Sequence, residues 1–159
     1  MSVRIASRDP DTDLYLGNYC PCCICIESGY HGSESPISDY VTDLGMQNVV
    51  VYDEKRQIPV VACWCFLGED AEGSLKLTVD NIEANTDYSG RYPEQIGAAI
   101  KRFIEEYAKA CGIDTKDIIQ GPDNNDLEIF ALGKVSRKLG GLYNKPEGYF
   151  LEALEDEDD

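Results

Sequence analysis

Seven cysteines and one histidine are the side chains of this chain best suited to binding a metal. The crowded group consists of Cys20, Cys22, Cys23, Cys25 and His31. A second pair, Cys63 and Cys65, flanks Trp64 and would point to one face of a strand. Structural zinc sites combine a C-x₂₋₄-C pair with ligands from a distant segment. The candidate zinc ligands are therefore Cys20, Cys23, Cys63 and Cys65, or Cys22, Cys25 and His31.

Cysteine chemistry leaves a second interpretation open. Cysteine is among the most frequently buried small residues, so ordinary core packing is the alternative interpretation of the same side chains. The N-terminal segment contains the charged residues Arg8 and Asp9 and shows no signal-peptide pattern. We therefore expect a cytoplasmic protein with reduced thiols.

Residues 75–112 form the second pattern with chemical potential. Residues 75–79 alternate apolar and polar side chains, as in a strand with one buried face, and 81–84 continue the pattern. A polar turn at 85–91 then leads into a helix, whose first N–H groups have no intrahelical partner and can bind phosphate. The unit is a candidate cofactor site; the alternative is an ordinary packed strand and helix.

The helix after this turn has signals at both ends. Pro93 suits the first helical position, and Gly112 is a natural C-terminal stop. One face is apolar and carries Ile96, Ile100, Phe103, Ile104, Tyr107 and Cys111. The other face is charged, so the pattern predicts an amphipathic helix over 93–111 that packs on a sheet.

Apolar patterns and turn signals place further elements around this unit. Strands are expected at 3–6, 47–52, 58–66, 118–120, 142–143 and 149–151. Helices are expected at 35–44 and 126–139, the second with Leu127, Phe130, Ala131 and Val135 on its inner face, and 14–26 is undecided between helix and loop. The fold class is therefore α/β (α+β), with a mixed, largely antiparallel central sheet flanked by helices.

The length of 159 residues and the charge pattern predict one domain with an acidic tail. The domain covers 1–151, with a cysteine-rich stretch of undecided structure at 7–35, and the disordered tail covers 152–159. The formal net charge of −16 argues against nucleic-acid binding, which needs basic surface. No apolar run is long enough to span a membrane. Cationic partners, such as an amine-bearing small molecule or a basic protein, are favoured, and an acidic DNA mimic is a further option.

The order and character of these segments resemble the GNAT superfamily of N-acetyltransferases over most of residues 47–151. The best-matching motifs are 81–90 leading into 96–100, and 138–143 followed by 148–151. The resemblance implies that the fourth strand splays away from the fifth and pairs with the pantetheine arm of acetyl-CoA. Ile82 and Ala84 would make these main-chain contacts. The turn before and at the helix start would cradle the pyrophosphate through Arg91, Gln95, Ile96, Gly97 and Ala98.

The resemblance also implies an activity. A base deprotonates an amine, which attacks the thioester, and an acid protonates the departing thiolate. The base would be Glu83 or Asp80. The family's acidic tyrosine falls on Ser136 here, and Tyr143 is the substitute nearby in sequence. The implied function is acyl-CoA-dependent N-acyl transfer to a primary amine.

Departures from the family motif keep an alternative function open. In the phosphate loop, aligning Gly97 with the last glycine puts Tyr92 where the family has Arg or Gln. The alternative is a catalytically inactive module of this fold that acts through protein interaction, with zinc as a candidate ligand.

Overall fold

Six strands form one open sheet in the computed structural model, which describes residues 1–7, 15–20, 45–85, 87–88, 93–122 and 126–137. The strands are β1 (Ser2–Ile5), β2 (Met46–Asp53), β3 (Ile58–Glu69), β4 (Leu75–Ala84), β5 (Ile118–Gln120) and β6 (Ser136–Arg137). They follow the order β1-β2-β3-β4-β5, and β6 pairs with the end of β3. All pairs are antiparallel except β4 and β5, which are parallel. The expected α+β architecture with a largely antiparallel sheet is confirmed.

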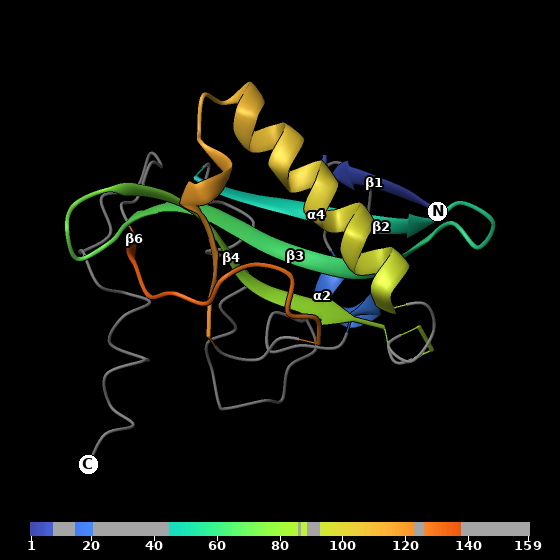
Figure 1. Cartoon of the computed structure of the whole chain (residues 1–159). Helices are drawn as coiled ribbons and strands as arrows, with labels where there is room; N and C mark the ends of the chain where they lie inside the picture. Colours follow the sequence, from blue (N-terminus) through green and yellow to red (C-terminus); the bar gives the residue numbers. More distant parts are fainter. Residues whose placement is uncertain (8–14, 21–44, 86, 89–92, 123–125, 138–159) are drawn as a thin grey trace, which may run out of the picture.

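Helix α4 (Pro93–Ala110) lies across one face of this sheet (Figure 1). Its residues Ile96, Ile100 and Ile104 are buried against a cluster of valines from β2 and β3 and against Ile82 of β4. The predicted amphipathic helix is therefore confirmed, except that Cys111, which was expected on the apolar face, follows the last helical residue and is exposed. Gly112 comes next with a φ of 77°, a conformation that favours glycine. Burial of this apolar face is what fixes α4 beside the carboxyl end of β4.

The opposite face of the sheet carries a second apolar cluster. It includes Trp64 and Phe66 of β3 together with Leu16 and Cys20 from the short helix α2 (Leu16–Tyr19) and its C-terminal end. Side chains of successive strand residues alternate between faces, so β3 serves both clusters and is buried along most of its length. Helix α2 lies within the stretch 14–26, which the sequence pattern left undecided.

The 126–137 segment differs from the prediction of a helix over 126–139. Instead of a helix, residues 126–135 follow an irregular path, with an isolated parallel bridge from Leu132 to Gln120, and β6 follows at Ser136–Arg137. The helical interpretation of Leu127, Phe130, Ala131 and Val135 is therefore wrong. Hydrogen bonds to β5 replace those of a helix: Gln120 N–H donates to Ala131 O, and Gly133 N–H donates to Gln120 O.

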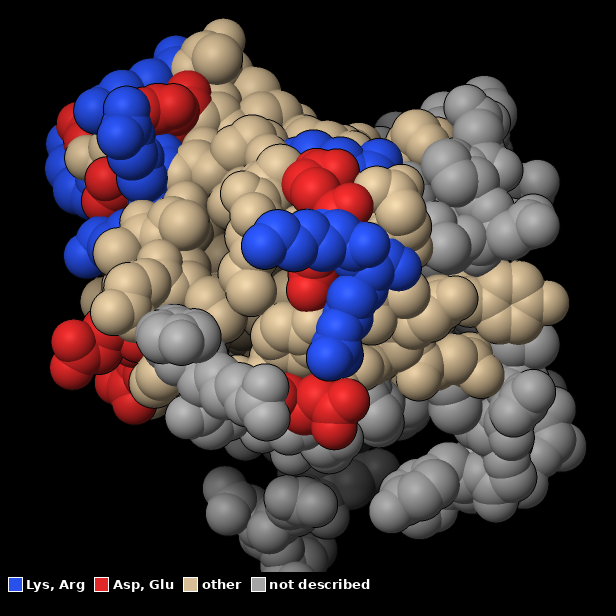
Figure 2. Space-filling model, turned by 90° about the vertical axis from the view of Figure 1, so that its right-hand side faces the viewer, with Lys and Arg blue, Asp and Glu red and all other residues tan. Residues whose placement is uncertain are grey.

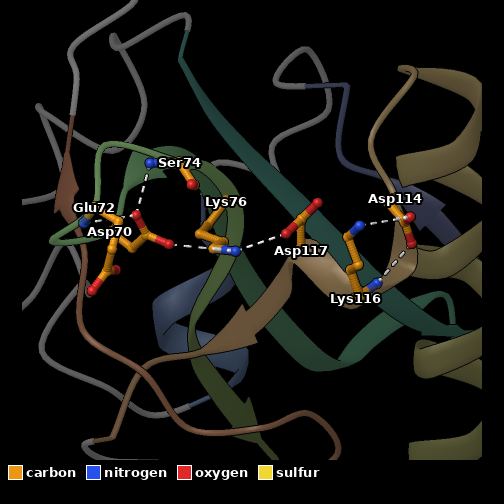
Figure 3. A network of polar contacts seen from close by, with 7 residues as sticks. All are labelled: Asp70, Glu72, Ser74, Lys76, Asp114, Lys116 and Asp117. Atoms are coloured by element: carbon orange, nitrogen blue, oxygen red, sulfur yellow. Dashed lines mark hydrogen bonds and ion pairs between the residues drawn. The ribbon is translucent and has the colours of Figure 1, made fainter.

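An ion-pair network ties the β3–β4 turn to the 3-10 helix η1 (Thr115–Asp117) that precedes β5 (Figure 3). Lys76 Nζ lies 2.7 Å from Asp117 Oδ1 and 3.4 Å from Asp70 Oδ2. Asp70 also accepts hydrogen bonds from the backbone of Glu72 and Ser74. These contacts hold the start of β4 against η1, so that β5 enters the sheet in register with Leu77.

Charges on one face of the molecule are mixed rather than segregated. On the face shown in Figure 2, acidic and basic side chains lie beside one another over a largely uncharged surface. Within the described ranges, no helix combines the length and apolar character needed to cross a membrane. The helix expected at 35–44, the closing strands at 142–151 and the acidic tail at 152–159 lie outside the described residues.

Candidate functional site at the diverging ends of β4 and β5

Strand β4 continues well past the end of its neighbour β5. The two strands pair from Leu77 with Ile118 to Val79 with Gln120, and Gly121 N–H donates to Val79 O at 2.8 Å. Beyond this point β4 runs on to Ala84. A register shift against β3 leaves Asp80 without a Cα partner, between the pairs formed by Val79 and Asn81. Residues 80–84 therefore extend beyond the β5 ladder, next to the N-terminal part of α4.

Asp126 binds the main chain of this extension. Its N–H donates to Ile82 O at 2.9 Å, and its carboxylate Oδ2 accepts from Ala84 N–H at 2.7 Å. Ile82 and Ala84 are the residues that the GNAT resemblance assigns to main-chain contacts with pantetheine. In this structure one aspartate, from the segment after β5, satisfies both of these main-chain groups.

The buried side chain of Gln120 anchors the residues that follow Asp126. Gln120 is fully buried, and its Oε1 accepts from the N–H groups of Ile129 (2.9 Å) and Phe130 (3.2 Å). Its Nε2 donates to Leu127 O at 2.8 Å. A buried amide that loses such partners is costly, so the carboxamide fixes the backbone of 127–130 beside the sheet.

An open pocket of about 290 Å³ separates this segment from the start of α4. Its lining consists of Pro93, Glu94, Gly97, Ala98, Lys101, Leu127, Glu128 and Ile129. Gly97, one of the lining residues, lies in close contact with Ile129, because a Cβ at Gly97 would lie 3.1 Å from Ile129 Cγ2. Lys101 Nζ lies 5.8 Å from the centre of the Phe130 ring and brings a positive charge to the pocket.

Glu83 is the ionisable group of β4 whose properties depart most from those of a surface acid. Burial and the nearby Asp126 carboxylate raise the pKa of Glu83 to about 7. It pairs across the ladder with Ala62, which belongs to the cluster on the α2 side of the sheet. Glu83 therefore projects on the face opposite α4, between two residues whose main-chain groups point to Asp126.

Asp80, the other predicted base, lies at the point where the strands diverge. Its backbone is so close to Gly121 that a Cβ on the glycine would lie 2.7 Å from Asp80 O. Asp80 is half-buried, and its charge adds to burial in raising the pKa of Cys65 to about 12. The structure thus places Asp80 and Glu83 at opposite ends of the β4 extension.

The other predicted cofactor-binding residues differ in how far their side chains are buried. Ile96 is buried in the core under α4, Gly97 and Ala98 line the pocket, and Gln95 is exposed on the first turn of the helix. Arg91 and Tyr143 lie outside the described residues.

The described cysteines are distributed over the two faces of the sheet. Cys63 and Cys65 belong to the cluster under α4, whereas Cys20 belongs to the cluster on the α2 side. Burial raises the pKa of the Cys63 thiol well above its usual value and so disfavours the thiolate that binds metal. Among the residues that the structure describes, no group of three or more Cys, His, Asp or Glu is arranged to hold a metal ion. Cys22, Cys23, Cys25 and His31 lie outside that part of the chain.

Three residues of this site, Gln120, Asp126 and Lys101, were not singled out from the sequence. Lys101 follows Gly97 by one helical turn, a spacing that places both on one side of α4. Gln120 carried a weaker signal, as a polar residue at the end of a three-residue strand. Asp126 carried none, because its role depends on a contact with β4 that is 42 residues away in sequence. No protein-family model matches this chain, and neither the comparison with curated proteins nor that with solved structures found a match.

Proposed function

We propose that this protein is an acyl-CoA-dependent N-acyltransferase of the GNAT type, which transfers an acetyl group to a primary amine. The observation that carries the proposal is the placement of Glu83 on the β4 extension, between Ile82 and Ala84 and beyond the last residue of β5. The strand order supports it as well, because an antiparallel meander, a crossover helix and a parallel fifth strand follow one another as the resemblance implies.

Acetyl-CoA would be held by groups of this chain that suit its chemistry. The pantetheine arm contains amides, and Ile82 O and Ala84 N–H offer an acceptor and a donor to such groups once Asp126 moves away. The pocket beside Gly97 lies next to the first turn of α4, where anions are favoured. Lys101 adds a positive charge one helical turn after Gly97, and it must outweigh the two carboxylates of the lining, Glu94 and Glu128. Bound acetyl-CoA would supply a thioester carbonyl that is activated toward an amine.

Glu83 acts as the general base in this proposal. An amine is protonated at neutral pH and must lose a proton to become a nucleophile, and a carboxylate with a pKa of about 7 can accept that proton at physiological pH. A usual surface glutamate would be a much weaker base. Tyr143 remains the proposed acid for the departing thiolate, and the cytoplasm remains the proposed compartment.

The direct test is acetyl transfer by the full chain to a panel of primary amines and basic peptides. We expect Glu83→Gln to lower kcat by about 100-fold or more while acetyl-CoA binding is retained. Glu72→Gln, in the exposed turn that leads into β4 and at the opposite end of the strand from Glu83, is the matched control and should leave kcat unchanged. Equal turnover by the wild-type protein and Glu83→Gln would remove Glu83 from the mechanism.

A second candidate function follows from the contacts of Asp126. Because Asp126 already satisfies Ile82 O and Ala84 N–H, the same geometry suits a non-catalytic module of this fold that acts through protein interaction. Such a module would bind no acetyl-CoA, even after the Asp126 contacts are removed. That outcome separates the two candidates.

A further inference from the structure

Asp126 supplies both kinds of hydrogen-bonding group that an amide ligand would bring to β4. Its N–H occupies the acceptor Ile82 O, and its carboxylate occupies the donor Ala84 N–H. An extended ligand with one amide N–H and one amide oxygen would make the same two contacts. Ligand and Asp126 therefore cannot bind this part of β4 together.

We propose that Asp126, which precedes the anchored residues 127–130, is a built-in plug that keeps the acyl-CoA site closed until the ligand displaces it. The inference rests on the proposed function, because it assigns a form of autoinhibition to the same site. It adds a determinant of affinity: the protein binds acyl-CoA only in the fraction of molecules whose plug is open.

The contacts of this segment would allow Asp126 to leave β4 while residues 127–130 stay in place. Gln120 holds Leu127, Ile129 and Phe130, and none of these three bonds involves Asp126. Asp126 is itself exposed, and its described bonds to β4 are the two main-chain contacts. The segment can therefore keep its anchor on β5 while Asp126 swings away from β4.

The contact is strong enough to compete with a ligand. The bond from Ala84 N–H goes to a carboxylate, and charge-assisted hydrogen bonds are roughly twice as strong as neutral ones. Glu83 opposes the closed state once it is ionised, since its carboxylate and that of Asp126 repel each other. The hydrogen bond to Ala84 favours the closed state and the repulsion between the two carboxylates opposes it, so closure is reversible.

The test is calorimetric titration of acetyl-CoA into the full-length wild-type protein, Asp126→Ala and Glu128→Ala. Glu128 is the matched control, because it carries the same charge two residues further along and lines the pocket without a described bond to β4. We expect Asp126→Ala to bind acetyl-CoA roughly tenfold more tightly than the wild type. Glu128→Ala should gain much less.

Amide hydrogen exchange at Ala84 supplies a readout that does not depend on affinity. Exchange should be faster in Asp126→Ala than in the wild type, and acetyl-CoA should restore protection in the variant. If Asp126→Ala does not fold, Asp126→Asn keeps the size of the side chain, weakens the bond by removing its charge, and should give a smaller gain in affinity.

Three results would overturn the inference. Equal affinity of all variants would reject the plug and keep the proposed function, since acetyl-CoA would still bind. Equal gains in Asp126→Ala and Glu128→Ala would show that only charge repulsion had been relieved. Binding to none of the proteins, with faster Ala84 exchange in Asp126→Ala, would reject the proposed function and the plug with it.

Discussion

Glu83 owes its raised pKa to its place on β4 rather than to the residues next to it in sequence. Partial burial and the Asp126 carboxylate both favour the protonated form and raise its pKa to about 7. The resemblance to the GNAT superfamily implied Glu83 or Asp80 as the base and did not distinguish between them. The raised pKa of Glu83 became visible only with Asp126, which comes from a segment that the sequence pattern assigned to a helix.

The raised pKa of Glu83 makes the free energy of unfolding depend on pH. Between pH 4.5 and about 7 the unfolded chain releases this proton while the folded chain keeps it. The free energy of unfolding therefore falls as pH rises through this range and then levels off. We expect Glu83→Gln to remove this contribution, so that it gains on the order of 1 kcal/mol over the wild type between pH 4 and pH 8 after allowance for solvent screening.

Urea denaturation at a series of pH values measures this difference. Glu72→Gln is again the control, since its side chain lies in an exposed turn. A constant difference between Glu83→Gln and the wild type at every pH would contradict the raised pKa.

At the scale of elements, the strands and α4 were predictable because each follows a local pattern. The alternation at Leu75–Ala84 matches β4 in full, and the start at Pro93 and the stop at Gly112 bracket α4 closely. The hairpin of β2 and β3 also follows from its apolar runs and polar turn.

Residues 126–137 were not predictable, because their structure is determined by tertiary contacts. Their apolar spacing is compatible with a helix, yet Gln120 and the main chain of β5 bind their backbone groups instead. A buried side chain from one element thus overrides the helical pattern in the next. The same contacts place Asp126 on β4, so the main feature of the site was out of reach of local patterns as well.

The anchoring role of Gln120 gives a prediction about this element. Gln120→Ala would leave the backbone groups of Leu127, Ile129 and Phe130 without their described partner and open a cavity at a fully buried position. We expect the free energy of unfolding to fall by about 3 kcal/mol. Denaturant titration checks this value.

Gln95→Ala is the control for this change, because Gln95 is exposed on the first turn of α4. It should change the free energy of unfolding by less than about 0.5 kcal/mol. A similarly small effect of Gln120→Ala would mean that the segment is held by apolar contacts such as that between Ile129 and Gly97.

For the whole molecule, the net charge favours binding of the amine substrate but opposes binding of CoA. The net charge of −16 attracts cationic amines and repels the anionic CoA at long range, although salt screens the repulsion beyond roughly 8 Å. Short-range contacts at the start of α4 and along β4 must therefore supply the affinity for CoA. Lys101, which lines the pocket, offers a positive charge for one of these contacts.

Binding of acyl-CoA at the diverging ends of β4 and β5 underlies both the proposed reaction and the proposed plug, and a native mass spectrum measures it. The full chain would be measured with and without acetyl-CoA, together with Asp126→Ala. We expect a mass increment of one acetyl-CoA per chain, at higher occupancy in Asp126→Ala. The absence of any increment in either protein would contradict the account and favour a non-catalytic binding module.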